Sequence, residues 1–398
     1  MQLTLEDALR RAEGASALVR RARAERLAVE ARDVGARLMF PANPVVAVGA
    51  GPRTESRTEQ RPEQVSGVGR DSGIQYALHA EQTLEIANQR GTRRTEVARA
   101  VEVAGWREAL AMAETRARVR TLYVGSQLAH AQARSARSRE ELVQKLVDSV
   151  RTRVDAGAAS NVDLELARLE RGRATRDRIT AELAVDVALA DLRVLIAAPP
   201  ALALSLISPL ATPAPPAELN VLLARARERR TELRALESSE AMLDAAVVRL
   251  RREAVPNPTV FLDLQRDLPG QVYVGGGIAL SLPVWRRNQG ELALARAERS
   301  RLREEGDVTA LQIAAEVERS YRAALAHAQM VAVVEKEVLP AAEAGVELVT
   351  QGWRAGKFDL FRVIQASREA SDARRSQLET LGALWEANIA LDRATGTP

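Results

Sequence analysis

The chain has 398 residues, with 57 Lys and Arg against 53 Asp and Glu, and it contains no cysteine. The lack of cysteine excludes thiol enzymes, disulfide frameworks and cysteine zinc sites. Basic and acidic residues alternate along helical segments, which is typical of solvated helix faces and argues against a nucleic-acid-binding stripe. No run approaches 18 consecutive apolar residues, so no transmembrane helix is expected.

The first part of the chain predicts one helix followed by two strands. Thr4 can cap a helix over 3–40, which the prolines at 41 and 44 end. A short apolar run over 44–51 and an alternating segment over 74–84 predict strands. The polar residues between them, 52–73, are expected to form a loop.

A very long helix is predicted next. Residues 88–156 contain no proline, and a helix of that length spans roughly 100 Å. The sequence Ala-Gly-Ala-Ala-Ser at 156–160 breaks it, and a further helix is expected to run to about residue 196. Residues 198–217 are rich in proline and alanine and carry no charge, which predicts a linker.

The second half of the chain follows the same order. Its expected elements are a helix over 218–255, strands over 259–265 and 272–282 joined by a tight turn at 266–270, a long helix over 288–355, and a last helix over 359–395. Asn43-Pro44 matches Asn257-Pro258, and Ala156-Gly157 matches Ala355-Gly356 at a slightly smaller offset, because the first strand-to-strand loop is the longer one. The sequence therefore predicts a duplication, with repeats over 1–197 and 218–398.

The four expected strands have one apolar face and one polar or small face. Strands of this length and alternation are typical of outer-membrane barrels, which abolish exposed sheet edges. Four strands are too few to close such a barrel, so at least two copies of the chain are required. Residues expected to face the lumen are His79, Glu81, Asp263 and Gln265. Those expected in an aromatic girdle are Phe40, Tyr76, Phe261, Tyr273 and Trp285.

The ordered motifs resemble the TolC-type outer-membrane factors, or outer membrane efflux proteins. They are the two Asn-Pro strand entries, the passage from Leu280 to Pro283 and on to Gly290, and the two Ala-Gly turns in RVDAGAASNVDLELA (153–167) and WRAGKFDLFRVIQA (353–366). The sequence LPVWRRNQGELALARAE at 282–298 is most similar to the Czc/Cus-type branch, which is linked to heavy-metal efflux.

This resemblance implies a mainly α protein with a β-barrel portion. Three copies would form a twelve-stranded transmembrane barrel in the outer membrane, continued by an α-helical barrel across the periplasm. The homotrimer would dock on a periplasmic adaptor (membrane fusion) protein and an inner-membrane pump. It would be a passive conduit exporting metal cations or small toxic compounds, with no enzymatic activity and no cofactor. The chain is taken as mature, with its export signal removed.

The resemblance also places a gate at the periplasmic end, near the helix turns at Gly157 and Gly356. Family members carry acidic residues there, and Asp163 matches the first-repeat position. At the second-repeat positions this chain has Arg362 and Gln365, so Asp359 is a candidate substitute. An ion pair between Asp163 and Arg362 is a candidate closed-state latch.

Other signals favour ordinary structural roles. The three histidines, His79, His130 and His327, are scattered and do not have metal-ligand spacing. The Gly275-Gly276-Gly277 run lies inside a strand, which favours relief of side-chain crowding over phosphate binding. The alternative to a channel is a helical scaffold or adaptor protein of the periplasm or cytosol, whose β segments form a small soluble domain.

Overall fold

The computed structural model describes residues 1–58, 68–266 and 271–397. The chain divides into two compact units, and each unit combines segments from both halves of the sequence. Unit 1 contains residues 1–24, 106–235 and 306–398, and unit 2 contains residues 25–105 and 236–305.

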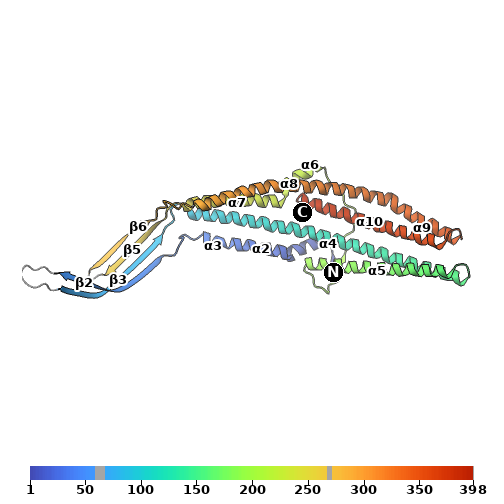
Figure 1. Ribbon diagram of the computed structural model, residues 1–398, viewed down its shortest axis with the longest axis horizontal. Helices are drawn as coiled ribbons and strands as arrows, with labels where there is room; N and C mark the ends of the chain where they lie inside the picture. Colours follow the sequence, from blue (N-terminus) through green and yellow to red (C-terminus); the bar gives the residue numbers. More distant parts are fainter. Residues whose placement is uncertain (59–67, 267–270, 398) are drawn as a thin grey trace, which may run out of the picture. The chain divides into compact units, whose positions relative to one another are not determined.

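Unit 2 contains a four-stranded antiparallel sheet in the order β2-β3-β5-β6. Its strands are β2 (Val45–Thr58), β3 (Val68–Thr83), β5 (Pro258–Arg266) and β6 (Val272–Leu280). The strands lie side by side (Figure 1), and β3 of the first half pairs with β5 of the second. The two halves therefore contribute one hairpin each to a single sheet.

The first hairpin is longer than the sequence predicts. The strand ladder continues beyond Gly51 and Gln75, from the Pro52–Ile74 pair to the Thr58–Val68 pair. Both ends of the expected loop over 52–73 therefore belong to strands, and the prediction is wrong there. Strands pair through backbone N–H and C=O groups, so the polar side chains of these residues do not prevent pairing. The middle of that loop, 59–67, and residues 267–270 of the tight turn expected in the second hairpin lie outside the described residues.

Two matching Asn-Gln pairs connect the sheet to the long helices. Asn88 and Asn288 have positive φ angles of 58° and 59°. The side-chain oxygen of the next residue, Gln89 or Gln289, accepts a hydrogen bond of 2.8 Å from the backbone two residues earlier. Asparagine tolerates this left-handed conformation better than most residues. The passage from strand to helix is thus built by the same local chemistry in both halves.

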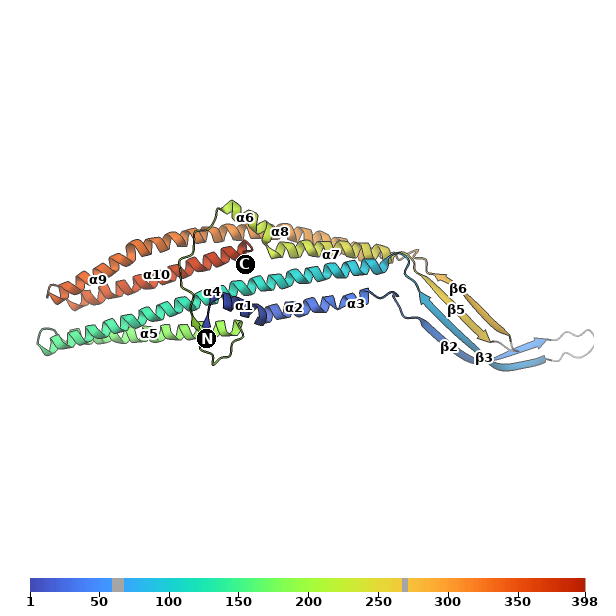
Figure 2. The same cartoon turned by 180° about the vertical axis from the view of Figure 1, so that it is seen from behind.

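The long helices begin at these Asn-Gln pairs and continue into unit 1. The first is α4 (Gln89–Asp155), which is followed by α5 (Asn161–Leu195). In the second half, α8 (Gln289–Val333) leads through a π-helical segment η1 (Val334–Val338) into α9 (Leu339–Arg354), and α10 (Leu360–Ala394) follows. In both views α5 lies beside α4 and α10 beside α9 (Figures 1 and 2). Over the described residues, none of the helices is both long and apolar enough to span a membrane.

The single helix predicted over 288–355 is interrupted, whereas α4 runs without a break. The cause is Pro340, which follows η1 closely and stands at the start of α9. Proline lacks a backbone N–H, and its ring clashes with the carbonyl four residues earlier in a regular helix. The wider π turn accommodates the ring, so the long helix of the second half carries a bulge that α4 lacks.

The N-terminal segment is also more divided than the predicted helix over 3–40. It forms β1 (Gln2–Leu3), α1 (Leu5–Ala15), α2 (Ala17–Glu30) and α3 (Arg32–Ala36). β1 pairs in parallel with β4 (Ser205–Leu206), which lies in the predicted linker. The linker is tied further by the indole N–H of Trp385, which donates to the Ala211 carbonyl at 3.0 Å. It leads into α6 (Leu219–Arg229) and α7 (Thr231–Glu253).

Candidate functional site

The two helix turns at Gly157 and Gly356 have the same construction. Their φ angles are +71° and +73°, in the left-handed region that favours glycine at the end of a helix. The following helix then starts on a side-chain cap, at Ser160 for α5 and at Asp359 for α10. Both turns lie in unit 1, and they are the places where the sequence predicts the helix tips.

The predicted acidic gate residues serve as local helix caps. The Asp163 carboxylate accepts hydrogen bonds from the backbone N–H of Ser160 at 3.0 Å and from the Ser160 hydroxyl at 2.7 Å. The Asp359 carboxylate accepts a bond of 3.0 Å from the backbone N–H of Arg362. Each carboxylate also lies at a helix N-terminus, where negative charge is stabilised. Both acids therefore have a structural role as helix caps, in addition to the gating role expected from the sequence.

Arg362 and Gln365 are exposed on the first turns of α10. The Arg362 guanidinium carbon lies 5.2 Å from the centre of the Phe358 ring, in a cation–π contact. Among the described residues of the chain, no ion pair joins Asp163 to Arg362. The structure therefore brings these candidates to the same end of unit 1 without forming the predicted latch within one chain.

A different contact connects the two turns, and the sequence did not reveal it. The guanidinium of Arg153, at the end of α4, lies 4.5 Å from the centre of the buried Trp353 ring, at the end of α9. It also donates to the backbone carbonyls of Trp353 at 3.4 Å and Arg354 at 3.2 Å. A cation that caps the last carbonyls of a helix is favoured by the helix dipole. Arg153 therefore ties the first hairpin of helices to the second.

A buried charge cluster forms a second connection between the helical hairpins. Glu170 on α5 is 3% exposed, and its carboxylate accepts hydrogen bonds from Arg139 on α4 at 2.8 Å and from Arg368 Nε on α10 at 3.0 Å. Arg173 lies 3.5 Å away. Burial opposes ionisation of Glu170, but the arginines, Arg368 first among them, outweigh burial and hold its pKa below the ordinary value.

The polar face of the sheet carries the residues predicted to face the lumen. His79 pairs with Asp263 across β3 and β5, and Nδ1 of the histidine lies 2.7 Å from the aspartate oxygen. Its Nε2 lies 3.5 Å from the Glu81 carboxylate. Gln265 lies on the same face, opposite Ala77. All four predicted residues therefore share one face of the sheet, in unit 2.

Glycines in β6 leave room for aromatic rings on this polar face. A Cβ atom added at Gly277 would lie 2.8 Å from the Phe261 ring, and one added at Gly275 would lie 2.3 Å from the Tyr273 hydroxyl. The rings therefore cover the glycines, which agrees with the predicted relief of crowding. Phe261 and Tyr273, two of the residues expected in an aromatic girdle, thus stand on the polar face of the sheet.

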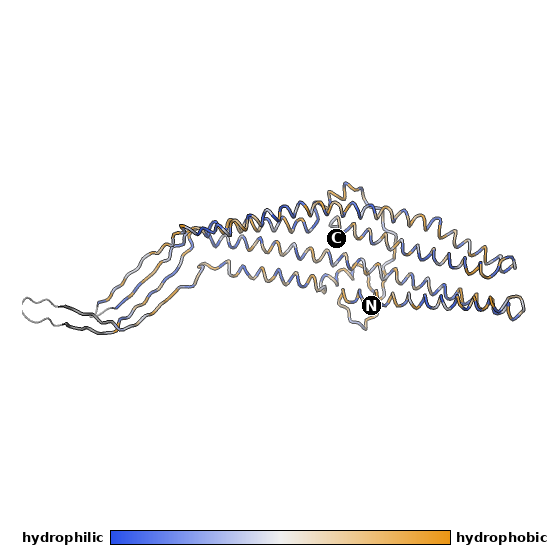
Figure 3. The backbone as a smooth tube through the Cα atoms, in the orientation of Figure 1, coloured by the Kyte–Doolittle hydropathy of each residue, from blue (hydrophilic) through white to orange (hydrophobic). Residues whose placement is uncertain are grey.

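The other face of the sheet is apolar and uncovered. Its residues include Val260, Leu262, Val274 and Ile278, all of which are exposed. Apolar and polar residues follow one another along the strands (Figure 3). Soluble monomers rarely expose a contiguous apolar sheet face, so this surface indicates contact with lipid or with a partner.

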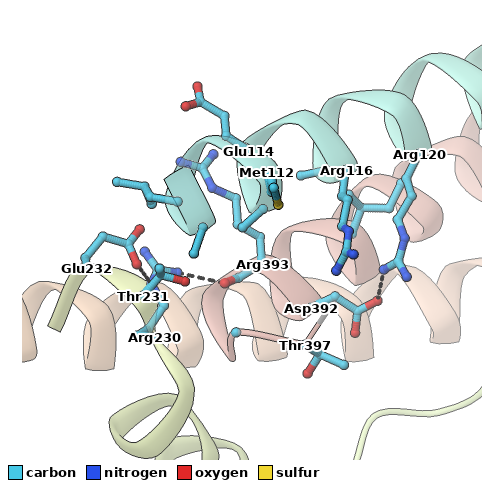
Figure 4. A pocket seen from close by; sticks show the side chains of 16 residues that line it. Met112, Glu114, Arg116, Arg120, Arg230, Thr231, Glu232, Asp392, Arg393 and Thr397 are labelled. Atoms are coloured by element: carbon cyan, nitrogen blue, oxygen red, sulfur yellow. Dashed lines mark hydrogen bonds and ion pairs between the residues drawn. The ribbon is translucent and has the colours of Figure 1, made fainter. Parts of the chain in front are cut away.

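The part of the chain that the structure describes holds no group of three His, Cys, Asp or Glu side chains placed to bind a metal ion. A pocket of about 370 Å³ lies in unit 1 between α4, the start of α7 and the end of α10 (Figure 4). Its charged side chains bind neighbouring groups: Arg120 pairs with Asp392 at 3.1 Å, and Arg230 donates to the Arg393 carbonyl at 2.9 Å. The pocket therefore lies where helices meet, and its arginines Arg120 and Arg230 already bind neighbouring groups of the chain.

Comparisons with known proteins agree with this construction. The sequence profile of the family described as "Outer membrane efflux protein" matches residues 222–397. The cobalt-zinc-cadmium resistance protein CzcC of Cupriavidus metallidurans is 26% identical over 315 residues, which cover 79% of this chain and 75% of that protein.

Solved outer-membrane channels have the same fold. CusC aligns with a TM-score of 0.77 at 15% identity, covering 99% of this chain and 92% of CusC. The channel OprN aligns at 0.75 and 17% identity, covering 99% and 90% of the two chains. The open state of the MtrE channel of Neisseria gonorrhoeae aligns at 0.75 and 16% identity, covering 98% and 88%. The family match thus covers the second part of the chain, and the likeness in fold covers nearly all of it.

Proposed function

We propose that this protein is the outer-membrane channel of a tripartite efflux system. The observation that carries the proposal is the four-stranded sheet of unit 2, which has an exposed apolar face, a polar face and two open edge strands, β2 and β6. An unpaired strand edge cannot be exposed to lipid, because every backbone group there needs a hydrogen-bonding partner. Three copies, joined edge to edge, give twelve strands and remove every edge.

The apolar face then contacts lipid and the polar face lines the pore. The sheet itself crosses the outer membrane, and the helices of the trimer extend the passage into the periplasm. A helical scaffold or adaptor protein, the alternative reading, would leave the apolar face of the sheet uncovered. The likeness to CzcC favours metal cations as cargo, within the Czc/Cus-type branch. A periplasmic adaptor protein and an inner-membrane pump are the implied partners.

The protein acts as a conduit, without catalysis and without a cofactor. Its two repeats, 1–197 and 218–398, joined by the linker 198–217, supply one strand hairpin and one tip each. The gate lies at the turns of Gly157 and Gly356. Arg153 and the Glu170 cluster hold the two helical hairpins of one chain together there, whereas Asp163 and Asp359 cap the helices and Arg362 and Gln365 remain exposed at the entrance.

The test begins with the purified protein. The full chain, expressed with an export signal, is expected in the outer-membrane fraction and to purify in detergent as a trimer. A monomer that is soluble without detergent would contradict the proposal. The cargo is tested in a strain that lacks its own channel: restored growth in cobalt, zinc or cadmium salts supports metal export, whereas restored growth only in organic toxicants would exclude it.

A further inference from the structure

The segment that joins β6 to α8, residues 281–288, carries exposed apolar side chains and is called the junction segment below. Leu282 and Val284 are exposed, and Trp285 is 85% exposed. Leu282 and Val284 continue the period of two residues that places Leu280 on the exposed apolar face of β6. The apolar surface of the sheet therefore extends past the end of the strand and reaches the start of the long helix.

Two side chains fold back on the junction segment and fix its backbone. The Nε of Arg287 donates to the Pro283 carbonyl at 2.9 Å. The side-chain amide of Gln289 donates to the Trp285 carbonyl at 2.7 Å. The indole therefore projects into the open from a backbone that is held by hydrogen bonds. A contiguous apolar surface presented in this way indicates a binding partner outside the chain.

A pocket of about 370 Å³ lies between the junction segment and the end of α7. The side-chain amide of Asn288 donates to the Leu250 carbonyl at 3.0 Å, which ties the segment to that helix. The lining is apolar apart from one arginine and consists of Ala254, Val255, Pro256, Leu282, Pro283, Val284 and Arg287. An apolar space beside a guanidinium suits a molecule that has a hydrocarbon chain and an anionic head.

Four exposed arginines belong to the two segments that form this pocket. They are Arg251 and Arg252 in the last turn of α7, and Arg286 and Arg287 in the junction segment. Across residues 1–58, 68–266 and 271–397, none of the four forms an ion pair. Two acids are close in sequence: Glu253 pairs with Arg249 at 2.6 Å, and Glu291 is exposed on the first turn of α8. The junction therefore has an excess of positive charge next to an apolar surface.

The first half of the chain builds the same junction without these residues. Its long helix begins with the same Asn-Gln cap, and Glu85, Ile86 and Ala87 stand where the second half has Trp285, Arg286 and Arg287. The Glu85 side chain is buried in an ion pair with Arg93. The fold of the junction therefore does not require a tryptophan followed by two arginines, and these three side chains are left for contact with a partner.

We propose that the junction segment of the second half binds an anionic phospholipid. Arg286 and the terminal nitrogens of Arg287 bind the head-group phosphate, because guanidinium groups pair with phosphate oxygens through parallel hydrogen bonds. The Trp285 indole lies at the level of the head groups, and an acyl chain packs into the apolar pocket. The inference rests on the proposed channel, which places the sheet in the membrane and the long helices in the periplasm. It assigns a lipid site at the periplasmic surface of that membrane.

Quenching of tryptophan fluorescence tests the assignment on the whole protein. The purified trimer in detergent is titrated with phosphatidylglycerol or with phosphatidylcholine, each carrying bromine on its acyl chains. We expect the anionic lipid to reach half of the maximal quenching at a roughly tenfold lower mole fraction than the zwitterionic lipid. The Trp285→Phe variant should lose this quenching. A variant that is quenched as strongly as the wild type would overturn the inference.

Arg286→Gln tests the role of the arginines without disturbing the fold, because the Arg286 side chain forms no hydrogen bond or ion pair in the part of the chain that the structure describes. We expect the preference for phosphatidylglycerol to fall about fivefold. The matched control is Arg319→Gln, which removes an exposed arginine far along α8 and should leave the preference unchanged. Equal losses in the two variants, or no loss in Arg286→Gln, would overturn the assigned site.

A last arm separates a lipid from a free anion. Replacing sodium chloride by sodium phosphate at equal ionic strength should leave the quenching unchanged, since inorganic phosphate makes no use of the apolar pocket. Displacement of the labelled lipid by phosphate alone would show a free-anion site and overturn the inference. A trimer that has no lipid preference would overturn it as well while leaving the channel intact, whereas wild-type protein that is not a trimer in detergent would contradict the proposed function.

Discussion

The variant Glu170→Gln tests whether the buried cluster holds the two helical hairpins together. The change keeps the shape of the side chain but removes the negative charge that Arg139, Arg173 and Arg368 share. Removing one member of a fully buried ion pair costs about 3–5 kcal/mol. Arg368 and Arg173 are 41% and 45% exposed, so water compensates part of the loss. We therefore expect a cost of about 2 kcal/mol.

The assay is thermal unfolding of the detergent-solubilised protein, followed by circular dichroism. For a unit of this size, about 2 kcal/mol lowers the melting temperature by roughly 4–8 °C. The matched control is Glu165→Gln, on the same helix, whose carboxylate is 67% exposed beside Arg168. It should change the melting temperature by less than about 2 °C. Equal shifts in the two variants, or no shift in Glu170→Gln, would refute the reasoning.

The pH dependence of the same pair gives an independent check. The pKa of Glu170 is lowered in the folded protein, so its contribution to stability is complete above the ordinary pKa of 4.5. That contribution is lost as the pH falls through the lowered folded pKa. The wild type should therefore be more stable than Glu170→Gln near neutrality, and the two should converge in acid. A constant difference down to low pH would contradict the assignment.

Three further predictions concern the gate, the sheet and the end of the chain. Arg153→Ala removes the contact that caps α9 and should raise the conductance of the channel in a planar bilayer, whereas Arg362→Ala should change the conductance less. A larger effect of Arg362→Ala would instead favour the ion pair between Asp163 and Arg362 as the latch. Gly277→Val places a side chain where the Phe261 ring lies and should lower the yield of detergent-stable trimer, while Ala279→Val should not. Gly396→Ala should cost about 1–2 kcal/mol or more in thermal unfolding, because its φ is +65° and the new Cβ would lie 2.8 Å from the Arg229 carbonyl oxygen.

The order of elements could be predicted because it depends on local signals. Prolines and glycines end the helices, and alternation marks the strands. Alternation also placed His79, Glu81, Asp263 and Gln265 on one face, since a strand has a period of two residues. The length of the first strand hairpin was missed because polar side chains do not prevent backbone pairing.

The connections between the helical hairpins could not be read from the sequence. Arg153 and Trp353 are 200 residues apart, and Glu170 lies 198 residues from Arg368. Each resembles an ordinary charged or apolar position of its own helix, because only the tertiary packing decides that Glu170 is buried. The capping role of Asp163, in contrast, is visible in the local spacing Ser-x-x-Asp.

The central claim is that three copies of the four-stranded sheet enclose a pore. The most direct measurement is the current through a planar lipid bilayer after addition of the purified trimer, together with the Arg153→Ala variant. We expect discrete conductance steps, larger or more frequent in the variant. A trimer that inserts into the bilayer and passes no current in either form would contradict it.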